Sequence, residues 1–200
     1  MARPRKFDED EVIAAARDQF WTHGYAATSL DDLVAVTGLG RGSLYGAFGD
    51  KHALFMRALD QYCTATMAAV RSELRDAAES AYDRLVGHIR SMARANATDG
   101  QRHGCLMAKS AAELAATDTA VASRVKRFID AYQAELVETV AAAQREGNID
   151  SGVNPRDVAV LVLAVLRGME ALRKGGASST TITTSGEQVI ALLPRAPRAN

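Results

Sequence analysis

Residues 38–49, GLGRGSLYGAFG, restrict the fold more than any other segment, because they carry five glycines in twelve positions. Glycine disfavours helix, yet Leu44, Tyr45 and Phe48 have the spacing of the buried stripe of a short helix. The preceding residues also predict a short helix. It begins at Thr28 or Ser29, each with an aspartate three positions later, and ends at Gly38. A helix, a glycine-containing turn and a second short helix are the layout of a helix-turn-helix.

The rest of the chain also shows helical periodicity, so we predict an all-α protein with no strands. The first helix should begin at Asp8 and end at Gly24, and another should begin at Asn154-Pro155 and run through Lys174. Residues 175–184 are expected to form a loop. Further helices are expected over residues 50–77, 79–97, 105–116, 121–146 and 185–193. We expect a helix-turn-helix domain over 1–56 with a basic arm at 1–7, a second helical domain over 57–193, and a disordered tail at 194–200.

Composition limits the partners of this chain. Its formal net charge is zero, so a nucleic-acid partner must be recognised by a few well-placed cations and not by a uniformly basic surface. No apolar run is long enough to cross a membrane. The two cysteines, Cys63 and Cys105, give neither a disulfide framework nor a CxxC pair, which favours a reducing cytoplasm.

The outer face of the short helix in residues 38–49 is small and almost flat once Leu44 and Phe48 point inward. We interpret its glycines as clearance, because a helix with few side chains can bring its backbone close to the bases and phosphates of a DNA major groove. Arg41 is the long donor on this face and could bind a guanine, while hydroxyl and ammonium groups nearby suit phosphate oxygens. The predicted DNA contacts are Arg5, Lys6, Thr28, Ser29, Arg41, Gly42, Ser43, Tyr45, Gly46 and Lys51.

The stretch TSLDDLVAVTGLGRGSLYGAFGDKHALF, residues 28–55, resembles the DNA-binding signature of the tetracycline-repressor (TetR) family of regulators. Two positions depart from the family pattern. Gly40 stands where Ser or Thr usually begins the reading helix, and Gly46-Ala47 replace a bulkier pair, so the bases that are read do not follow from the resemblance. The shared features are Thr28, Leu33-Val34, Gly38, the run from Gly42 to Tyr45, Phe48, and Lys51-His52-Ala53-Leu54.

The resemblance implies that residues 1–56 are a DNA-binding domain for a double-stranded operator and that residues 57–193 are a helical effector-binding and dimerisation domain. It also implies a homodimer with two DNA-binding domains and a small-molecule effector. Independently of it, residues 121–146 and 155–174 are too apolar for one-sided surface helices, which favours a four-helix bundle between two copies, although an internal core is the alternative. The expected interface residues are Val125, Ile129, Leu136, Val158, Leu161, Val162, Val165, Leu166 and Met169. The expected effector-binding residues are Met67, Tyr82, Met92, Cys105, Met107, Phe128 and Tyr132, although such a set is also typical of a core.

Three other functional hypotheses compete with this one. Cys105 lies close to His103 and Lys109 in the sequence and could be a thiol that senses oxidants or electrophiles, although a buried structural cysteine is the alternative. A helical adaptor for other proteins would need neither the flat face nor the basic arm. An enzyme is disfavoured, because the sequence has no HExxH array, GxSxG or phosphate-loop pattern. His103 and Cys105 alone do not make a metal site, and we expect no metal or cofactor.

Overall fold

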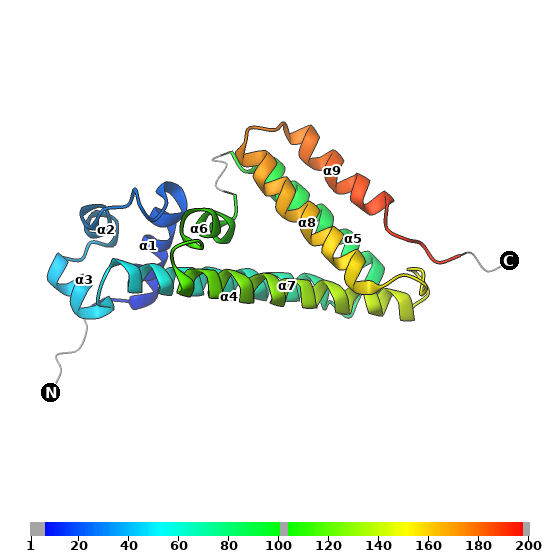
Figure 1. Cartoon of the computed structure of the whole chain (residues 1–200), viewed down its shortest axis with the longest axis horizontal. Helices are drawn as coiled ribbons and strands as arrows, with labels where there is room; N and C mark the ends of the chain where they lie inside the picture. The colour runs from blue at the N-terminus through cyan, green and yellow to red at the C-terminus, as the bar shows by residue number, and fades with distance from the viewer. Residues whose placement is uncertain (1–6, 101–103, 198–200) are drawn as a thin grey trace. The chain divides into compact units, whose positions relative to one another are not determined.

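A computed structural model describes residues 7–100 and 104–197. Within these residues the chain forms nine helices and one isolated antiparallel bridge, between Ile149 and Arg195, which confirms the all-α prediction (Figure 1). No described helix has the length and apolar character needed to span a membrane. The helices are α1 (Glu9–His23), α2 (Leu30–Thr37), α3 (Arg41–Phe48), α4 (Lys51–Leu74), α5 (Ala81–Thr98), α6 (Leu106–Leu114), α7 (Thr119–Arg145), α8 (Pro155–Lys174) and α9 (Ser179–Ala191).

The helices group into two compact units. The first comprises the described residues of Met1–Ala65 together with Leu106–Val125, and the second comprises those of Thr66–Cys105 and Lys126–Asn200. The sequence predicts a boundary at residue 56, with α6 in the second domain. In the structure α6 packs instead with the N-terminal helices. Two of its side chains, Lys109 and Glu113, hydrogen-bond backbone groups at the end of α1 and in the turn after it, which are more than eighty residues away in the sequence.

Local capping explains how the first unit begins. The Asp8 carboxylate accepts a hydrogen bond from the backbone N–H of Asp10 at 2.8 Å, and α1 ends at Gly24 with φ +91°. Ser29 and Asp32 form the predicted capping box at the start of α2. The core that these helices share includes Val12, Ile13, Ala16, Phe20, Leu33, Leu44, Phe48, Leu54 and Phe55.

In the second unit α5, α8 and α9 lie side by side (Figure 1). Gly186 on α9 allows α5 to approach closely, since a Cβ added there would lie 2.9 Å from the Cβ of Ala93. α8 begins as predicted, with Asn154 as the capping residue and Pro155 in the first turn.

Two predictions for the C-terminal region are wrong. α9 begins at Ser179, so residues 179–184 are helical and not part of a loop: the Ser178 hydroxyl accepts from the N–H of Thr181, and Ile182 is fully buried. Part of the predicted disordered tail is also ordered. The N–H of Asp150 donates to the carbonyl of Pro194 at 3.0 Å, and residues 194–197 are described with the second unit. The last three residues lie outside the described residues.

Candidate nucleic-acid interface

α3 presents the flat face expected from the sequence. Leu44 and Phe48 are buried, whereas Gly42, Ser43 and Gly46 are exposed and 47% of the Tyr45 surface is accessible. A Cβ added at Gly42 or Gly46 would meet no atom within 4 Å. Packing within the chain therefore does not require glycine at either position. Gly40 begins α3 without a side-chain capping bond, as its lack of a hydroxyl dictates.

Arg41 does not extend freely into solvent. Its guanidinium forms an ion pair with the carboxylate of Asp31 on α2, although the two side chains remain 62% and 72% exposed. The pair joins the two helices of the helix-turn-helix across their open surface. The sequence places Asp31 only at the start of α2, because two residues ten positions apart on different helices give no pattern that predicts their contact.

The structure separates two hydroxyls that the sequence analysis treated alike. Thr28 is fully buried and its hydroxyl donates to the carbonyl of Gly24 at 2.7 Å, so the prediction of a DNA contact by this side chain is wrong. Ser29 is exposed and caps α2. The hydrogen bond from Ser29 lowers the pKa of Asp32 below its usual value, which keeps the capping carboxylate ionised. The exposed N-terminus of α2 therefore begins at Ser29.

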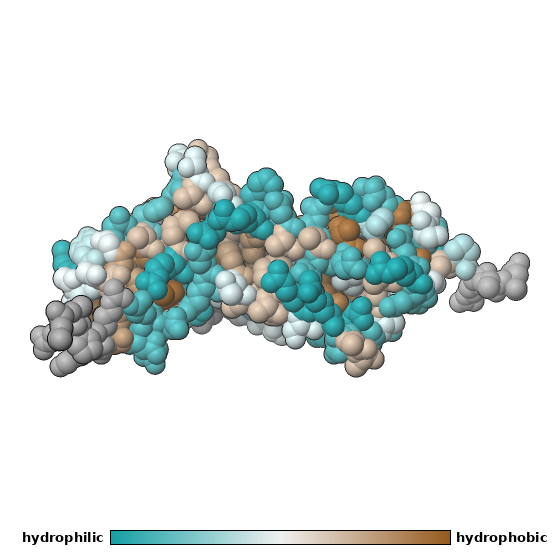
Figure 2. Space-filling model, turned by 90° about the horizontal axis from the view of Figure 1, so that it is seen from below, coloured by the Kyte–Doolittle hydropathy of each residue, from teal (hydrophilic) through white to brown (hydrophobic). Residues whose placement is uncertain are grey.

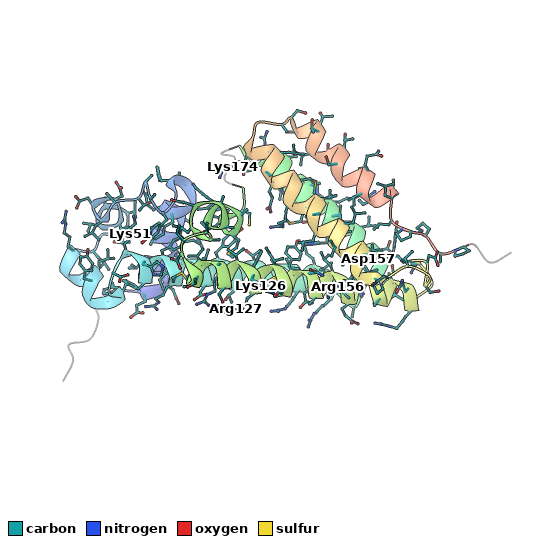
Figure 3. All side chains as sticks on the ribbon, viewed as in Figure 1. Lys51, Lys126, Arg127, Arg156, Asp157 and Lys174 are labelled. Atoms are coloured by element: carbon teal, nitrogen blue, oxygen red, sulfur yellow. The ribbon has the colours of Figure 1, made fainter. Side chains whose placement is uncertain are left out.

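Lys51 lies in the first turn of α4 (Figure 3), as expected from the sequence. Its ammonium lies 4.3 Å from the centre of the Tyr25 ring, a cation–π contact that limits where the side chain can point. Burial, followed by the negative charges of Asp50, Asp118 and Glu113, raises the pKa of the Tyr25 hydroxyl, so the tyrosine is neutral at physiological pH. Arg5 and Lys6, the other predicted cations, lie outside the described residues.

Most of the predicted interface residues prove to be core. Five of them are buried within their own unit, which corrects their assignment: Leu136, Val158, Val162, Leu166 and Met169. The error has a physical cause, because periodicity identifies an apolar helix face but does not show whether the same chain covers it. The other predicted residues keep some exposure: Val125 and Val165 are partly exposed, and Ile129 and Leu161 are exposed.

A shallow apolar groove lies between α8 and α9 in the second unit. Leu161, Val165 and Leu172 line it from α8, and Val189 and Leu192 line it from the other side. Leu192 is 70% exposed and lies beside other exposed apolar side chains, and monomeric proteins rarely expose such side chains together. On the face drawn in Figure 2, by comparison, hydrophobic residues occur as separate spots among hydrophilic ones.

The predicted effector-binding residues do not all come together. Met67, Cys105, Phe128 and Tyr132 are buried in the second unit, whereas Met107 is buried in the first. Tyr82 and Met92 are partly exposed. The three hollows described in the second unit are lined by other residues, so an effector pocket at these positions stays a prediction.

The buried residues of the second unit include a polar chain that the sequence analysis missed. The hydroxyl of Tyr132 is 2.6 Å from Nε2 of His88, whose Nδ1 lies 2.6 Å from a carboxylate oxygen of Glu73. The hydrogen bond with His88 lowers the pKa of Glu73, and burial strongly raises the pKa of Tyr132. An ionised Glu73 therefore forms a hydrogen bond with the buried His88, which forms a second hydrogen bond with the neutral Tyr132.

Cys105 is buried beside two charged groups. Its sulfur lies 3.5 Å from Nη1 of Arg167, and the same guanidinium pairs with Glu170 at 3.0 Å. Burial raises the pKa of Glu170, although Arg167 and a hydrogen bond with Cys105 act in the opposite direction. Across residues 7–100 and 104–197 no group of three histidine, cysteine or acidic side chains could hold a metal ion, and His103 is outside these ranges.

Comparison with known proteins places this arrangement among DNA-binding regulators. Residues 12–58 match the family described as bacterial regulatory proteins, tetR family, and residues 81–182 match the tetracyclin repressor-like C-terminal domain. The HTH-type transcriptional repressor ComR of Escherichia coli is 28% identical over 176 residues, which cover 88% of this chain and 84% of ComR. A cysteine mutant of the TetR-family regulator CifR, in complex with a 26-base-pair operator DNA, superposes with a TM-score of 0.82 at 26% identity and covers 96% of this chain and 100% of its own. The reduced form of E. coli NemR shares the fold, with a TM-score of 0.85 at 17% identity over 95% of this chain and 98% of its own.

Proposed function

Because this chain belongs to the TetR family of bacterial regulatory proteins, we propose that it is a transcriptional repressor that binds a palindromic DNA operator as a homodimer. The observation that carries the proposal is the exposed outer face of α3, which keeps glycine at positions where the chain's own packing leaves room for a side chain. Binding to a partner explains these glycines, and a major groove about 12 Å wide is such a partner. The operator complex of CifR supports the assignment.

On this proposal α3 reads the bases and the helix ends around it bind phosphates. Arg41 could bind a guanine with both terminal nitrogens after it leaves Asp31, and Ser43 and Tyr45 offer hydroxyls. The exposed start of α2 at Ser29 and the first turn of α4 at Lys51 offer backbone N–H groups and positive charge to the DNA backbone.

Dimerisation would use the groove between α8 and α9. A second copy would cover Leu161, Leu172 and Leu192, whose exposure is otherwise unfavourable. A two-fold axis through a bundle of these helices places the same groove against itself, so each side buries equivalent residues. The two DNA-binding domains of such a dimer predict half-sites whose centres lie about 34–36 Å apart, which is one turn of DNA, or a multiple of that distance.

A small molecule bound in the second unit would act as the inducer. It would release DNA only to the extent that it binds the DNA-free conformation more tightly than the DNA-bound one. The buried set of Met67, Phe128 and Tyr132 is the candidate site. Since the target is bacterial chromosomal DNA, we place the protein in the cytoplasm.

The test is to select bound duplexes from a random pool and to measure affinity against salt. We expect a palindrome, a steep loss of affinity with rising salt, and a loss of sequence preference in Arg41→Ala. Arg145→Ala, which removes an exposed arginine of α7 that pairs with Glu138, is the matched control. Selection of no duplex, or affinity that does not change with salt, would reject the proposal and favour a protein-binding adaptor.

A thiol sensor is the second candidate function, and the Arg167–Cys105 contact favours it. The Arg167 guanidinium lies 3.5 Å from the sulfur, and cysteines that react with oxidants and electrophiles commonly lie beside such positive charges. We expect peroxide or an aldehyde to release DNA from the wild type and from Cys63→Ser, but not from Cys105→Ser. Equal release from wild type and Cys105→Ser would remove this candidate and leave the DNA-binding proposal intact.

A further inference from the structure

Two side chains of α6 bind the main chain of the turn between α1 and α2. Lys109 donates from its ammonium to the carbonyls of Trp21 at 2.8 Å and Thr22 at 2.9 Å. Glu113, one helical turn further along the same face, accepts from the N–H groups of Tyr25 at 3.0 Å and Ala26 at 2.5 Å. We call these four bonds the α6 clasp. It lies entirely within the first unit.

The lysine contacts complete the end of α1. The last carbonyls of an α-helix have no partner within the helix, and a positive charge near them also interacts favourably with the helix dipole. Lys109 supplies both, from a helix more than eighty residues away in the sequence. Lys109 therefore adds to the local cap of α1, in which the N–H of Gly24 donates to the carbonyl of Phe20.

The glutamate contacts fix the turn that follows. Two successive N–H groups point at one carboxylate, an arrangement that gives strong charge-assisted hydrogen bonds. The turn is shaped for this approach, because Gly24 has φ +91° and a Cβ added there would lie 3.0 Å from the Glu113 carboxylate. A side chain at this position would both strain the backbone and displace Glu113.

The clasped turn leads directly into the N-terminus of α2. The Thr28 hydroxyl binds the carbonyl of Gly24, and the next residue, Ser29, caps α2. We propose that Lys109 and Glu113 are positioning residues for DNA binding: through this turn α6 holds the N-terminus of α2 in the orientation that binds phosphate. The inference rests on the proposed DNA-binding function and assigns to it two residues that do not touch DNA.

The experiment measures affinity for a duplex selected by the wild type, over a range of salt concentrations. Glu113→Gln keeps one acceptor but loses the charge and the second acceptor, and we expect it to weaken binding about tenfold. The contact that is lost is made by uncharged backbone N–H groups and not by a lysine or arginine, so the slope of log K against log salt should stay close to that of the wild type. Lys109→Met should act similarly, whereas Lys109→Arg, which keeps two donors, should bind like the wild type. Glu138→Gln and Lys126→Met alter exposed pairs of the second unit and serve as controls.

A purely structural role would lower thermal stability but leave the DNA affinity of the folded protein unchanged at temperatures well below its Tm. Unchanged affinity in Glu113→Gln and Lys109→Met would overturn the inference, while failure of the wild type to select any duplex would reject the proposed function instead. A measurement that needs no variant covers the case in which these proteins do not fold. The amide hydrogens of Tyr25 and Ala26 should exchange slowly in the wild type, and exchange as fast as in a free peptide would overturn the clasp.

Discussion

Alanine at Gly42 and Gly46 should raise stability and lower DNA affinity in the same molecule. Both glycines lie in α3, and an added Cβ meets nothing within 4 Å at either position. Glycine in a helix costs about 0.5–1 kcal/mol relative to alanine, with the smaller figure suited to Gly42 in the first turn. The double variant should therefore gain about 1.5 kcal/mol, which corresponds to a rise in Tm of about 3–6 °C for a chain of this length.

DNA binding should change in the opposite direction. If the bare face of α3 lets its backbone approach the bases and phosphates, each added methyl group increases the closest possible separation. Loss of even one backbone or Arg41 contact is worth about 1.4 kcal/mol, so we expect at least a tenfold weaker Kd for each single variant. Opposite signs in the two measurements distinguish clearance from general damage to the fold.

The assay pairs thermal unfolding at a fixed protein concentration with fluorescence anisotropy on a selected duplex. Gly87→Ala is the matched control, because Gly87 is an exposed glycine of α5 that also has no atom within 4 Å of an added Cβ. It should gain stability without any change in Kd. If Gly42→Ala and Gly46→Ala gain stability and still bind like the wild type, the glycines of α3 do not serve as clearance.

Three further substitutions test other parts of the structure. Asp31→Asn removes the carboxylate that pairs with Arg41 and would face phosphate, so affinity for all duplexes should rise severalfold while the ratio between selected and scrambled duplexes falls in parallel titrations. Gly186→Ala forces a methyl group against α5 and should cost about 1–3 kcal/mol, less the gain in helix propensity, seen as a lower Tm than that of the wild type. Burial alone would raise the pKa of Glu135. Hydrogen bonds from Arg71 in α4 and from Arg75, directly after α4, outweigh this effect and hold the pKa of Glu135 below the ordinary 4.5. The ionised Glu135 therefore stabilises the folded protein above pH 4.5, and this contribution is lost on acidification. Glu135→Gln should be about 1.5–3 kcal/mol less stable than the wild type at pH 7 in urea unfolding, and the difference should shrink as the pH falls below 4.

The ends of helices were predictable because their causes are local. Asp8, the Ser29 capping box and Asn154 each satisfy backbone groups within three residues of themselves, so sequence spacing contains the whole interaction. The start of α9 was missed for a related reason. Its first turns are rich in serine and threonine, which suggest a loop, and the helix depends on burial of Ile182 in a core that sequence spacing does not show.

The covering of apolar faces could not be predicted in the same way. Leu161 and Leu166 both belong to the apolar pattern of α8, yet Leu161 is exposed and Leu166 is fully buried. The difference comes from α5 and α9, which pack on one side of α8 and leave another side open. A periodic pattern describes one helix, whereas burial depends on at least two.

The contrast between α3 and Gly24 shows which functional features a sequence reveals. The glycines of α3 conflict with helix formation and no packing contact accounts for them, which is why we propose a partner outside the chain. Gly24 has a sufficient local explanation, since it ends α1 with a positive φ, and its second role beside Glu113 was therefore hidden. The α6 clasp joins side chains to main-chain groups, which every residue possesses, so it leaves no pattern of residue types. A functional residue is visible in sequence when it violates a local rule, and residues that act through ordinary backbone groups must be found in the structure.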